Sequence, residues 1–195
     1  MLAAVILAAG ESRRMGSPKA LLPYRGSTFL EYLLQITRHT SVGWTRVVVG
    51  AHAPEIARAV HLVRDELVNN LDWEKGQLSS IQAALRSLPP DKTDGILLCP
   101  VDHPLVSAVL VGALIEAFYK TGKSIVVPTY KQKRGHPMIF SKALYDELLA
   151  APEDVGARAV VWAHAEDLLE IPTDEEGVVL NLNDPETLAR AQHAE

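Results

Sequence analysis

Four short apolar runs, rich in Val, Ile and Leu, alternate along the chain with longer amphipathic stretches. Polar residues do not alternate with apolar ones inside these runs, which favours strands that are buried on both faces. The predicted strands are Leu2–Ala8, Thr45–Gly50, Asp94–Cys99 and Ser124–Pro128.

Helices are predicted between these strands. The first extends from about Thr28 to His39, because Thr28 and Glu31 have the spacing of a capping box and apolar residues follow at helical intervals. Pro54 suits the first turn of a second helix, where a missing N–H costs nothing. Further helices are predicted at Ser80–Leu88, at Leu105–Thr121 with Gly122 as its C-cap, and at Ser141–Ala150.

This alternation predicts an α/β protein with three layers, in which helices cover both faces of a mostly parallel sheet. In such folds the binding site lies at the carboxyl ends of the strands, so the loops that follow the strands are the places to look. We find no internal repeat or linker, and we expect one domain over residues 1–195. The loops are Ala9–Lys19, Asn69–Ser80, Pro100–Pro104 and Thr129–Pro137.

Composition narrows the class of protein further. Hydrophobic residues make up 48% of the chain and charged residues 22%, as in an ordinary globular protein. The net charge of -5 argues against a nucleic-acid partner. Cys99 is the single cysteine, which excludes an intramolecular disulfide, and the run Leu2–Ala9 is too short to span a bilayer. We therefore expect a cytoplasmic protein with no membrane partner.

The loop after the first predicted strand reads L-A-A-G-E-S-R-R-M-G-S-P-K, from Leu7 to Lys19. Gly10 and Gly16 let the backbone approach a ligand closely, and Arg14 with Lys19 adds fixed positive charge. These features suit a triphosphate, although the loop is neither a Walker loop nor a dinucleotide fingerprint. The alternative is a solvated glycine loop that carries two surface cations.

This loop resembles the first loop of the MobA-like nucleotidyltransferases, L-A-(A/G)-G-x-S-x-R-M-G-x-x-K. Within that family the chain is most similar to the molybdenum-cofactor cytidylyltransferases, and four later motifs extend the resemblance over nearly the whole chain. The resemblance implies a nucleotide-diphospho-sugar transferase (Rossmann-like) fold. It also implies that the nucleotide is bound by Leu7, Ala8, Ala9, Gly10, Ser12, Arg14, Gly16 and Lys19, together with Asn70 and Ser80 from a later loop.

The motif C-P-V-D-H-P places Asp102 directly after the third predicted strand. A carboxylate at this point can hold Mg²⁺, which prefers one or two carboxylates together with waters and substrate phosphates. Members of the family that it resembles have their metal-binding aspartate here. The alternative is an aspartate that only forms a turn beside Pro104.

The segment from Asn69 to Ile81 resembles the family pattern N-P-x-W-x-x-G-x-x-x-S, with Leu71 in place of the usual proline. An amide at Asn70 can read a base or ribose, because it both donates and accepts hydrogen bonds. A serine at position 80 can cap a helix and face a phosphate. Trp73 can stack on a ligand or simply pack in the protein.

The segment K-Q-K-R-G-H-P, from Lys131 to Pro137, concentrates positive charge in an acidic protein. The resemblance shares its Gly-His-Pro step and implies that Arg134 and His136 contact the acceptor. The alternatives are a solvated basic loop and a structural histidine.

The segment N-L-N-D-P-E-T-L, from Asn181 to Leu188, resembles the family's C-terminal motif. Asn183 stands where an aspartate often completes the metal site, and an amide is a weaker Mg²⁺ ligand because it brings no charge. The alternative is a plain helix start at Asp184-Pro185-Glu186.

Taken together, the resemblance implies a Mg²⁺-dependent transfer of CMP from CTP to the phosphate of a molybdopterin-type cofactor, with release of pyrophosphate. Mg²⁺ on Asp102, with Arg14 and Lys19, would neutralise the transition state, and the methyl group of Ala9 would exclude a purine. The expected partners are CTP or another NTP and a phosphorylated pterin-type small molecule, and a molybdoenzyme or its chaperone stays open as a further partner.

Three other interpretations remain. The first is a related transferase that uses GTP or a sugar or polyol phosphate acceptor. The second is a nucleotide-binding regulator without turnover, and the third is a dehydrogenase, which the missing dinucleotide fingerprint disfavours.

Overall fold

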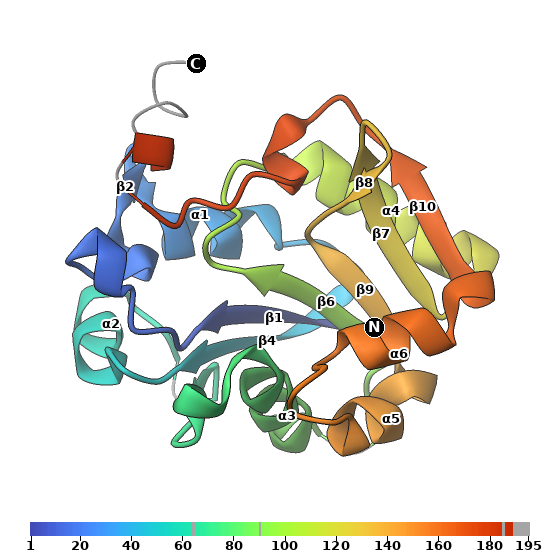
Figure 1. Ribbon diagram of the computed structural model, residues 1–195, viewed down its shortest axis with the longest axis horizontal. Helices are drawn as coiled ribbons and strands as arrows, with labels where there is room; N and C mark the ends of the chain where they lie inside the picture. The colour runs from blue at the N-terminus through green and yellow to red at the C-terminus, as the bar shows by residue number, and fades with distance from the viewer. Residues whose placement is uncertain (64, 90, 185, 189–195) are drawn as a thin grey trace.

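The computed structural model describes residues 1–63, 65–89, 91–184 and 186–188, so Pro185 and the last residues of the expected 1–195 domain lie outside the described part. Within that part, one sheet has the strand order β10-β7-β9-β6-β1-β4-β5, with β8 paired to β7 (Figure 1). A short hairpin of β2 (Pro23–Tyr24) and β3 (Ser27–Thr28) stands apart from it. The strands of the large sheet are β1 (Leu2–Ala8), β4 (Val42–Val49), β5 (Leu67–Asn69), β6 (Gly95–Pro100), β7 (Ile125–Tyr130), β8 (Lys133–Arg134), β9 (Met138–Ser141) and β10 (Leu168–Pro172).

The sheet is mostly parallel, as the sequence predicts. β1 runs parallel to both β4 and β6, and β10 runs parallel to β7. β9 lies between β6 and β7 and is antiparallel to both, and β8 is antiparallel to β7. The four predicted strands are all present with small shifts at their ends.

Helices cover the two faces of the sheet. Residues of α1 (Phe29–Ile36), α2 (Ala53–Ala59) and α4 (Ala108–Thr121) pack into one core cluster, and those of α3 (Gln77–Ser87), α5 (Tyr145–Ala150) and α6 (Arg158–Ala163) pack into another. Figure 1 shows α3, α5 and α6 together on one side of the sheet. Single 3-10 turns occur at Arg13–Met15, Lys19–Leu21, Trp73–Lys75, Lys142–Leu144, Ala165–Asp167 and Glu176–Val178. The three-layer α/β/α arrangement that we expected is confirmed.

Strand β1 contributes to both cores, because successive side chains point to opposite faces of a sheet. Leu2 and Ile6 pack with α1 and α4, whereas Val5 and Leu7 pack with α3. Every residue of the strand is buried. Two-sided burial explains why its sequence is uniformly apolar rather than alternating.

The predicted capping box at the start of α1 is present. The Thr28 hydroxyl accepts a hydrogen bond from the Glu31 backbone N–H at 3.2 Å, and the Glu31 carboxylate accepts one from the Thr28 N–H at 2.8 Å. The helix ends at Ile36, earlier than predicted, and the Thr37 hydroxyl donates to the Leu33 carbonyl oxygen. Gly122 caps α4 in the left-handed conformation, as predicted.

Several predicted boundaries are wrong. Helix α3 begins at Gln77, not at Ser80, so Ser80 lies buried in its first turn and does not cap it. Helix α4 begins only at Ala108, because the Ser107 hydroxyl accepts from the Leu110 N–H and caps the helix there. The strands β5 and β10 lie at the two edges of the sheet and are only partly buried, which leaves them without a continuous apolar run.

Among the described residues, no helix has both the length and the apolar character that a membrane crossing requires.

We expect Thr28→Ala to lower the free energy of unfolding by about 1 kcal/mol, because the substitution removes the cap of α1. Urea denaturation measures this change. Thr40→Ala is the control, since Thr40 is exposed and outside any helix or strand. Equal stability of the two variants would contradict the capping role.

Candidate functional site

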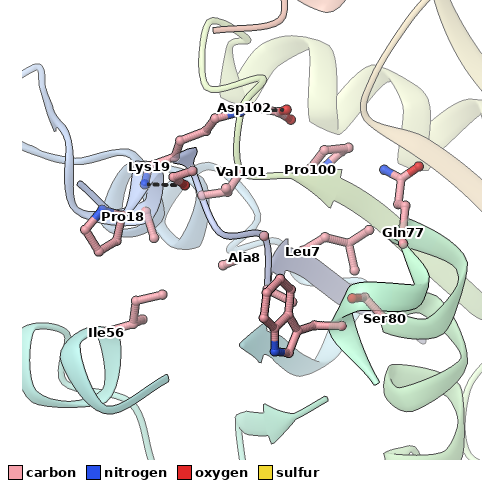
Figure 2. A pocket seen from close by; sticks show the side chains of 16 residues that line it. Leu7, Ala8, Pro18, Lys19, Ile56, Gln77, Ser80, Pro100, Val101 and Asp102 are labelled. Carbon is pink, nitrogen blue, oxygen red and sulfur yellow. Dashed lines mark hydrogen bonds and ion pairs between the residues drawn. The ribbon is translucent and has the colours of Figure 1, made fainter. Parts of the chain in front are cut away.

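A cavity of about 230 Å³ opens at the carboxyl ends of β1 and β6 (Figure 2). The connection after β1 leads outward to β4 on one side, and β6 lies on the other side, so the strand order reverses at this point. A crevice at such a reversal is the usual ligand site of an open α/β sheet. The lining residues are Leu7, Ala8, Ala9, Gly10, Ser12, Pro18, Lys19, Ala20, Ile56, Trp73, Gly76, Gln77, Ser80, Pro100, Val101 and Asp102.

The first loop is held in a compact turn at the edge of the cavity. Ser12 has a φ of 55°, its carbonyl oxygen accepts from the Met15 N–H, and its hydroxyl accepts from the Lys19 N–H at 3.1 Å. From outside the loop, the Ala51 N–H donates to the Ala9 carbonyl oxygen. These bonds fix the backbone on both sides of Gly10.

Lys19 is the centre of the charged end of the cavity. Its Nζ lies 3.4 Å from Asp102 Oδ2 and also donates to Asn183 Oδ1. The Lys19 and Asp102 side chains are only 15% and 21% exposed, so this contact is shielded from bulk water. The structure therefore brings together three candidate site residues from separate motifs, Lys19, Asp102 and Asn183.

Asp102 and Asn183 are held in place by backbone contacts of the C-terminal segment. The Leu182 N–H donates to the Asp102 carbonyl oxygen at 2.9 Å, which sets the residue next to Asn183 against the loop after β6. Figure 1 shows this segment, in red, returning from β10 across the sheet towards β2.

The same segment approaches the neighbouring loops very closely. A Cβ on Gly177 would lie 1.6 Å from the Leu105 carbonyl oxygen, and one on Gly135 would lie 2.2 Å from that of Val178. The His136 N–H donates to the Val178 carbonyl oxygen. Glycine is required at both positions for the segment to lie flat against the loops.

Some predicted site residues lie outside the cavity lining. Arg14 and Gly16 are exposed on the outer part of the first loop. Arg134 is exposed and pairs with Glu170 at 2.7 Å across the sheet edge. These residues keep their predicted roles only as hypotheses, and in this structure they do not line the pocket.

Asn70 is buried, and its amide is occupied within the protein. Its Nδ2 donates to Ser79 Oγ at 2.9 Å and to Ser80 Oγ at 3.0 Å, while its Oδ1 accepts from the Asp72 N–H. The side chain therefore ties the loop after β5 to the first turn of α3. Trp73 lines the cavity and also packs with the core beneath α3.

Gln77 also lines the cavity, although no sequence pattern singles it out. A lone glutamine between Gly76 and Leu78 carries no motif, and the predicted helix start at Ser80 placed it in a loop. A predicted helix start at Gln77 would have identified this residue as a candidate. A side chain in the first turn of a helix that begins beside a strand end faces the crevice there.

His103 and His136 form a half-buried pair of rings next to Asp102 in the chain fold. Their ring centroids are 5.0 Å apart, and the Nδ1 atom of each ring is buried without a hydrogen-bond partner. Burial lowers the pKa of His103, and burial together with the neighbouring His103 lowers the pKa of His136 to about 4. Both rings are therefore neutral at pH 7, so His136 can offer a hydrogen bond to an acceptor molecule but not a positive charge.

The described residues contain no group of three or more His, Cys, Asp and Glu side chains that could hold a metal ion. Asp102 and Asn183 nevertheless direct two oxygens at one point, which the Lys19 ammonium group takes up. One carboxylate and one amide oxygen, completed by water and substrate phosphates, is a ligand set that suits Mg²⁺. The residues thus fit a metal that binds together with a triphosphate, not one bound by the protein alone.

Comparison with known proteins gives a match to the MobA-like NTP transferase domain over residues 4–168. A probable molybdenum cofactor guanylyltransferase of Mycobacterium avium is 31% identical over 98% of this chain and 96% of its own. Nicotine blue oxidoreductase of Paenarthrobacter nicotinovorans is 32% identical over 79% of this chain and 78% of its own.

The Rv0371c protein of Mycobacterium tuberculosis is a structural neighbour with a TM-score of 0.82 and 27% identity, covering 99% of this chain and 98% of its own. A structure of that protein in complex with manganese has a TM-score of 0.80, with 100% and 99% coverage. The fold is that of the nucleotide-diphospho-sugar transferases, as the resemblance implied. Because the family match spans most of the chain and includes the loop, strand and aspartate that line the cavity, the chain belongs to the MobA-like NTP transferase family.

Proposed function

We propose that this protein transfers a nucleotidyl group from an NTP to the phosphate of a molybdopterin-type acceptor and releases pyrophosphate. The observation that carries the proposal is the position of Lys19, between Asp102 and Asn183, at the charged end of a cavity bordered by the first loop. The family membership and the guanylyltransferase name of the M. avium relative support the choice of reaction and acceptor.

In this reaction an oxygen of the acceptor phosphate attacks the α-phosphorus of the NTP. The bond between the α-phosphorus and the bridging oxygen breaks, and pyrophosphate leaves with the electron pair. The attacking oxygen is already anionic, so no general base is required. The work of the protein is to position the two substrates and to stabilise charge, and the Lys19 ammonium group would leave Asp102 and Asn183 for the triphosphate.

Asp102 and Asn183 would hold the metal ion, which we propose to be Mg²⁺. When bound with the triphosphate, such an ion neutralises phosphate oxygens and orients them for an in-line displacement. The backbone N–H groups of the first loop, near Gly10 and Ser12, would bind the remaining phosphate oxygens. Arg14, exposed on the same loop, is the proposed further cation.

We favour GTP as the nucleotide over CTP, which the sequence suggested. That suggestion depends on the resemblance of the first loop to that of the cytidylyltransferases and on the Ala9 methyl group as the physical reason. Ala9 is only 5% exposed and packs in the core cluster that contains Trp73 as a partly buried member. A methyl group covered in this way presents little surface against a purine. The guanylyltransferase name of the M. avium relative adds to the case for GTP.

The acceptor would lie beyond the charged end of the cavity, towards the half-buried His103 and His136 pair. Because His136 is neutral, it would orient the acceptor through a hydrogen bond, and the cation that meets the acceptor phosphate would be Lys19 or the metal. Arg134 forms an ion pair with Glu170, so it is less available to bind the acceptor than we expected.

The second candidate is an oxidoreductase, and the similarity to nicotine blue oxidoreductase is the observation that favours it. An enzyme of that class needs a redox cofactor. The most polar part of this cavity is instead the Lys19 ammonium group, which lies between an oxygen of Asp102 and an oxygen of Asn183. The two functions differ in their product, since only a nucleotidyltransferase releases pyrophosphate.

Pyrophosphate release is the direct test. We expect release from GTP with Mg²⁺ and molybdopterin-type cofactor, and a decrease of about 10²–10³ in kcat for Asp102→Ala and for Lys19→Met. Asp91→Ala is the control, because Asp91 is exposed and pairs with Lys142 outside the cavity. No pyrophosphate release with any of the four NTPs would exclude the proposed reaction, and full activity in Asp102→Ala would exclude the proposed role of Asp102.

Asn183 can be tested separately from catalysis. We expect Asn183→Asp to tighten Mn²⁺ binding in the presence of a non-hydrolysable NTP by roughly tenfold, because the new ligand carries charge. Electron paramagnetic resonance of free Mn²⁺ measures this affinity. Asn181→Asp adds the same charge at an exposed position two residues away and serves as the control. Equal affinities of the two variants would remove Asn183 from the metal site.

The lowered pKa of His136 predicts a pH dependence of stability. In the unfolded chain a histidine takes up a proton below about pH 6.5, whereas folded His136 does so only near pH 4. Stability is therefore fully present above pH 6.5 and is lost as the pH falls, by up to about 1.4 kcal/mol per pH unit from this group. Urea denaturation between pH 7 and pH 5 should show a smaller loss in His136→Gln than in the unaltered protein. The same loss in both would contradict the neutral, buried state of His136.

A further inference from the structure

The loop after β4 holds the first loop from its outer side. The Ala51 N–H donates to the Ala9 carbonyl oxygen at 3.1 Å, and His52 Nε2 lies 2.8 Å from the Glu11 carbonyl oxygen. Ala51 and His52 themselves lie outside the cavity lining. Figure 1 shows α2, which His52 precedes, beside the blue loop that follows β1. Two carbonyl groups of the first loop therefore point towards the start of α2.

The N–H groups that belong to the same two peptides point the other way. Both peptides are trans, and in a trans peptide the C=O and the following N–H have opposite directions. Anchoring the carbonyls of Ala9 and Glu11 thus directs the N–H groups of Gly10 and Ser12 away from α2. Gly10 and Ser12 line the cavity, and within the described part of the chain neither N–H has a hydrogen-bond acceptor. The anchors therefore leave two backbone donors available to a ligand.

The surroundings of these donors suit an anion. Ser12 has a φ of 55°, and turns with such a residue are typical of backbone in which successive N–H groups bind one anion. The Glu11 carboxylate would oppose an anion, but it accepts from Arg13 Nε at 2.6 Å and lies outside the cavity lining. Lys19 adds a positive charge to the same cavity. A phosphate group has the charge and the acceptor oxygens that this arrangement requires.

The His52 ring is itself fixed in orientation. Its Nε2 carries a proton in the contact with Glu11, because a carbonyl oxygen only accepts. Its Nδ1 lies 3.5 Å from Glu55 Oε1, and the side chain is 24% exposed. The His52 carbonyl oxygen accepts from the N–H groups of Glu55 and Ile56. Ring and backbone are both tied to α2, so His52 can hold the peptide between Glu11 and Ser12 in one orientation.

We propose that His52 is a positioning residue for phosphate binding, which fixes the Glu11 carbonyl and thereby aims the Ser12 N–H at a phosphate group of the NTP. The inference rests on the proposed function, since that function places a triphosphate beside the first loop. Without the bond from His52, the peptide would be free to rotate, and ordering it on binding would lower the affinity. The contact at stake is charge-assisted, so its loss is measurable.

The proposal predicts a graded response to substitutions of His52. His52→Ala removes the donor. His52→Gln retains a donor, because a glutamine amide extends about as far from the backbone as the Nε2 of histidine, whereas the shorter amide of His52→Asn does not reach Glu11. His61→Ala is the matched control, since His61 is exposed, outside any helix or strand and outside the cavity lining.

The test is titration calorimetry of α,β-methylene-GTP with Mg²⁺ and without acceptor. We expect His52→Ala and His52→Asn to bind the analogue about tenfold more weakly, the size of one charge-assisted hydrogen bond. His52→Gln and His61→Ala should bind it like the unaltered protein. Guanosine, which has no phosphate, should bind equally to every variant in saturation-transfer NMR. General damage to the cavity would weaken both ligands, whereas the proposed role affects the triphosphate alone.

The outcomes separate the two proposals. Unchanged affinity of His52→Ala for the analogue, with binding by the unaltered protein, would overturn the role of His52 and leave the proposed function standing. Equal weakening of analogue and guanosine, or no recovery in His52→Gln, would also overturn that role. Failure of the unaltered protein to bind the α,β-methylene analogue of any of the four NTPs would overturn the proposed function and this inference together.

Discussion

Burial of β1 on both faces is the constraint on which the rest of the structure depends. The strand can be covered on both sides only if helices lie above and below it and parallel strands lie at both edges, as β4 and β6 do. Parallel neighbours need crossover connections: the chain passes from β1 outward to β4 and β5 on one side and then returns to β6 on the other side of β1. The crevice at its carboxyl end is thus a consequence of the way in which the core is covered, and the loop from Ala9 to Lys19 begins inside it.

The C-terminal segment brings Asn183 to the cavity that lies at the ends of the central strands. It leaves the far edge of the sheet at β10 and returns across the loops after β6 and β8, held by backbone hydrogen bonds from Leu182 and His136. Two glycines allow contact distances that a side chain would forbid, and the result is that Asn183 reaches Lys19. Residues from the beginning, the middle and the end of the chain meet at one point.

The sequence was informative wherever local physics decides the structure. Two-sided burial leaves a continuous apolar run, so β1 was predicted residue for residue, and the capping box at Thr28 and Glu31 depends on neighbours three positions apart. Ser80 was misplaced because the first turn of α3 is polar and faces the cavity, which removes the hydrophobic periodicity.

Contacts between distant residues could not be read from the pattern. The bond between Lys19 and Asn183 joins positions 164 apart in the chain, and the partner of Arg134 is Glu170 on another strand. Motif resemblance singled out candidate site residues, but not which of them touch one another. It also missed Gln77, which lines the cavity at the point where α3 starts.

The position of Lys19 has a consequence for how the site is assembled. A carboxylate that is largely removed from water needs a counter-ion, and for Asp102 the chain supplies one from its own first loop. Folding of the site is therefore separate from loading with metal, in contrast to proteins in which the ion holds the ligands together. A chelator should therefore leave this protein folded, with Asp102 still paired to Lys19.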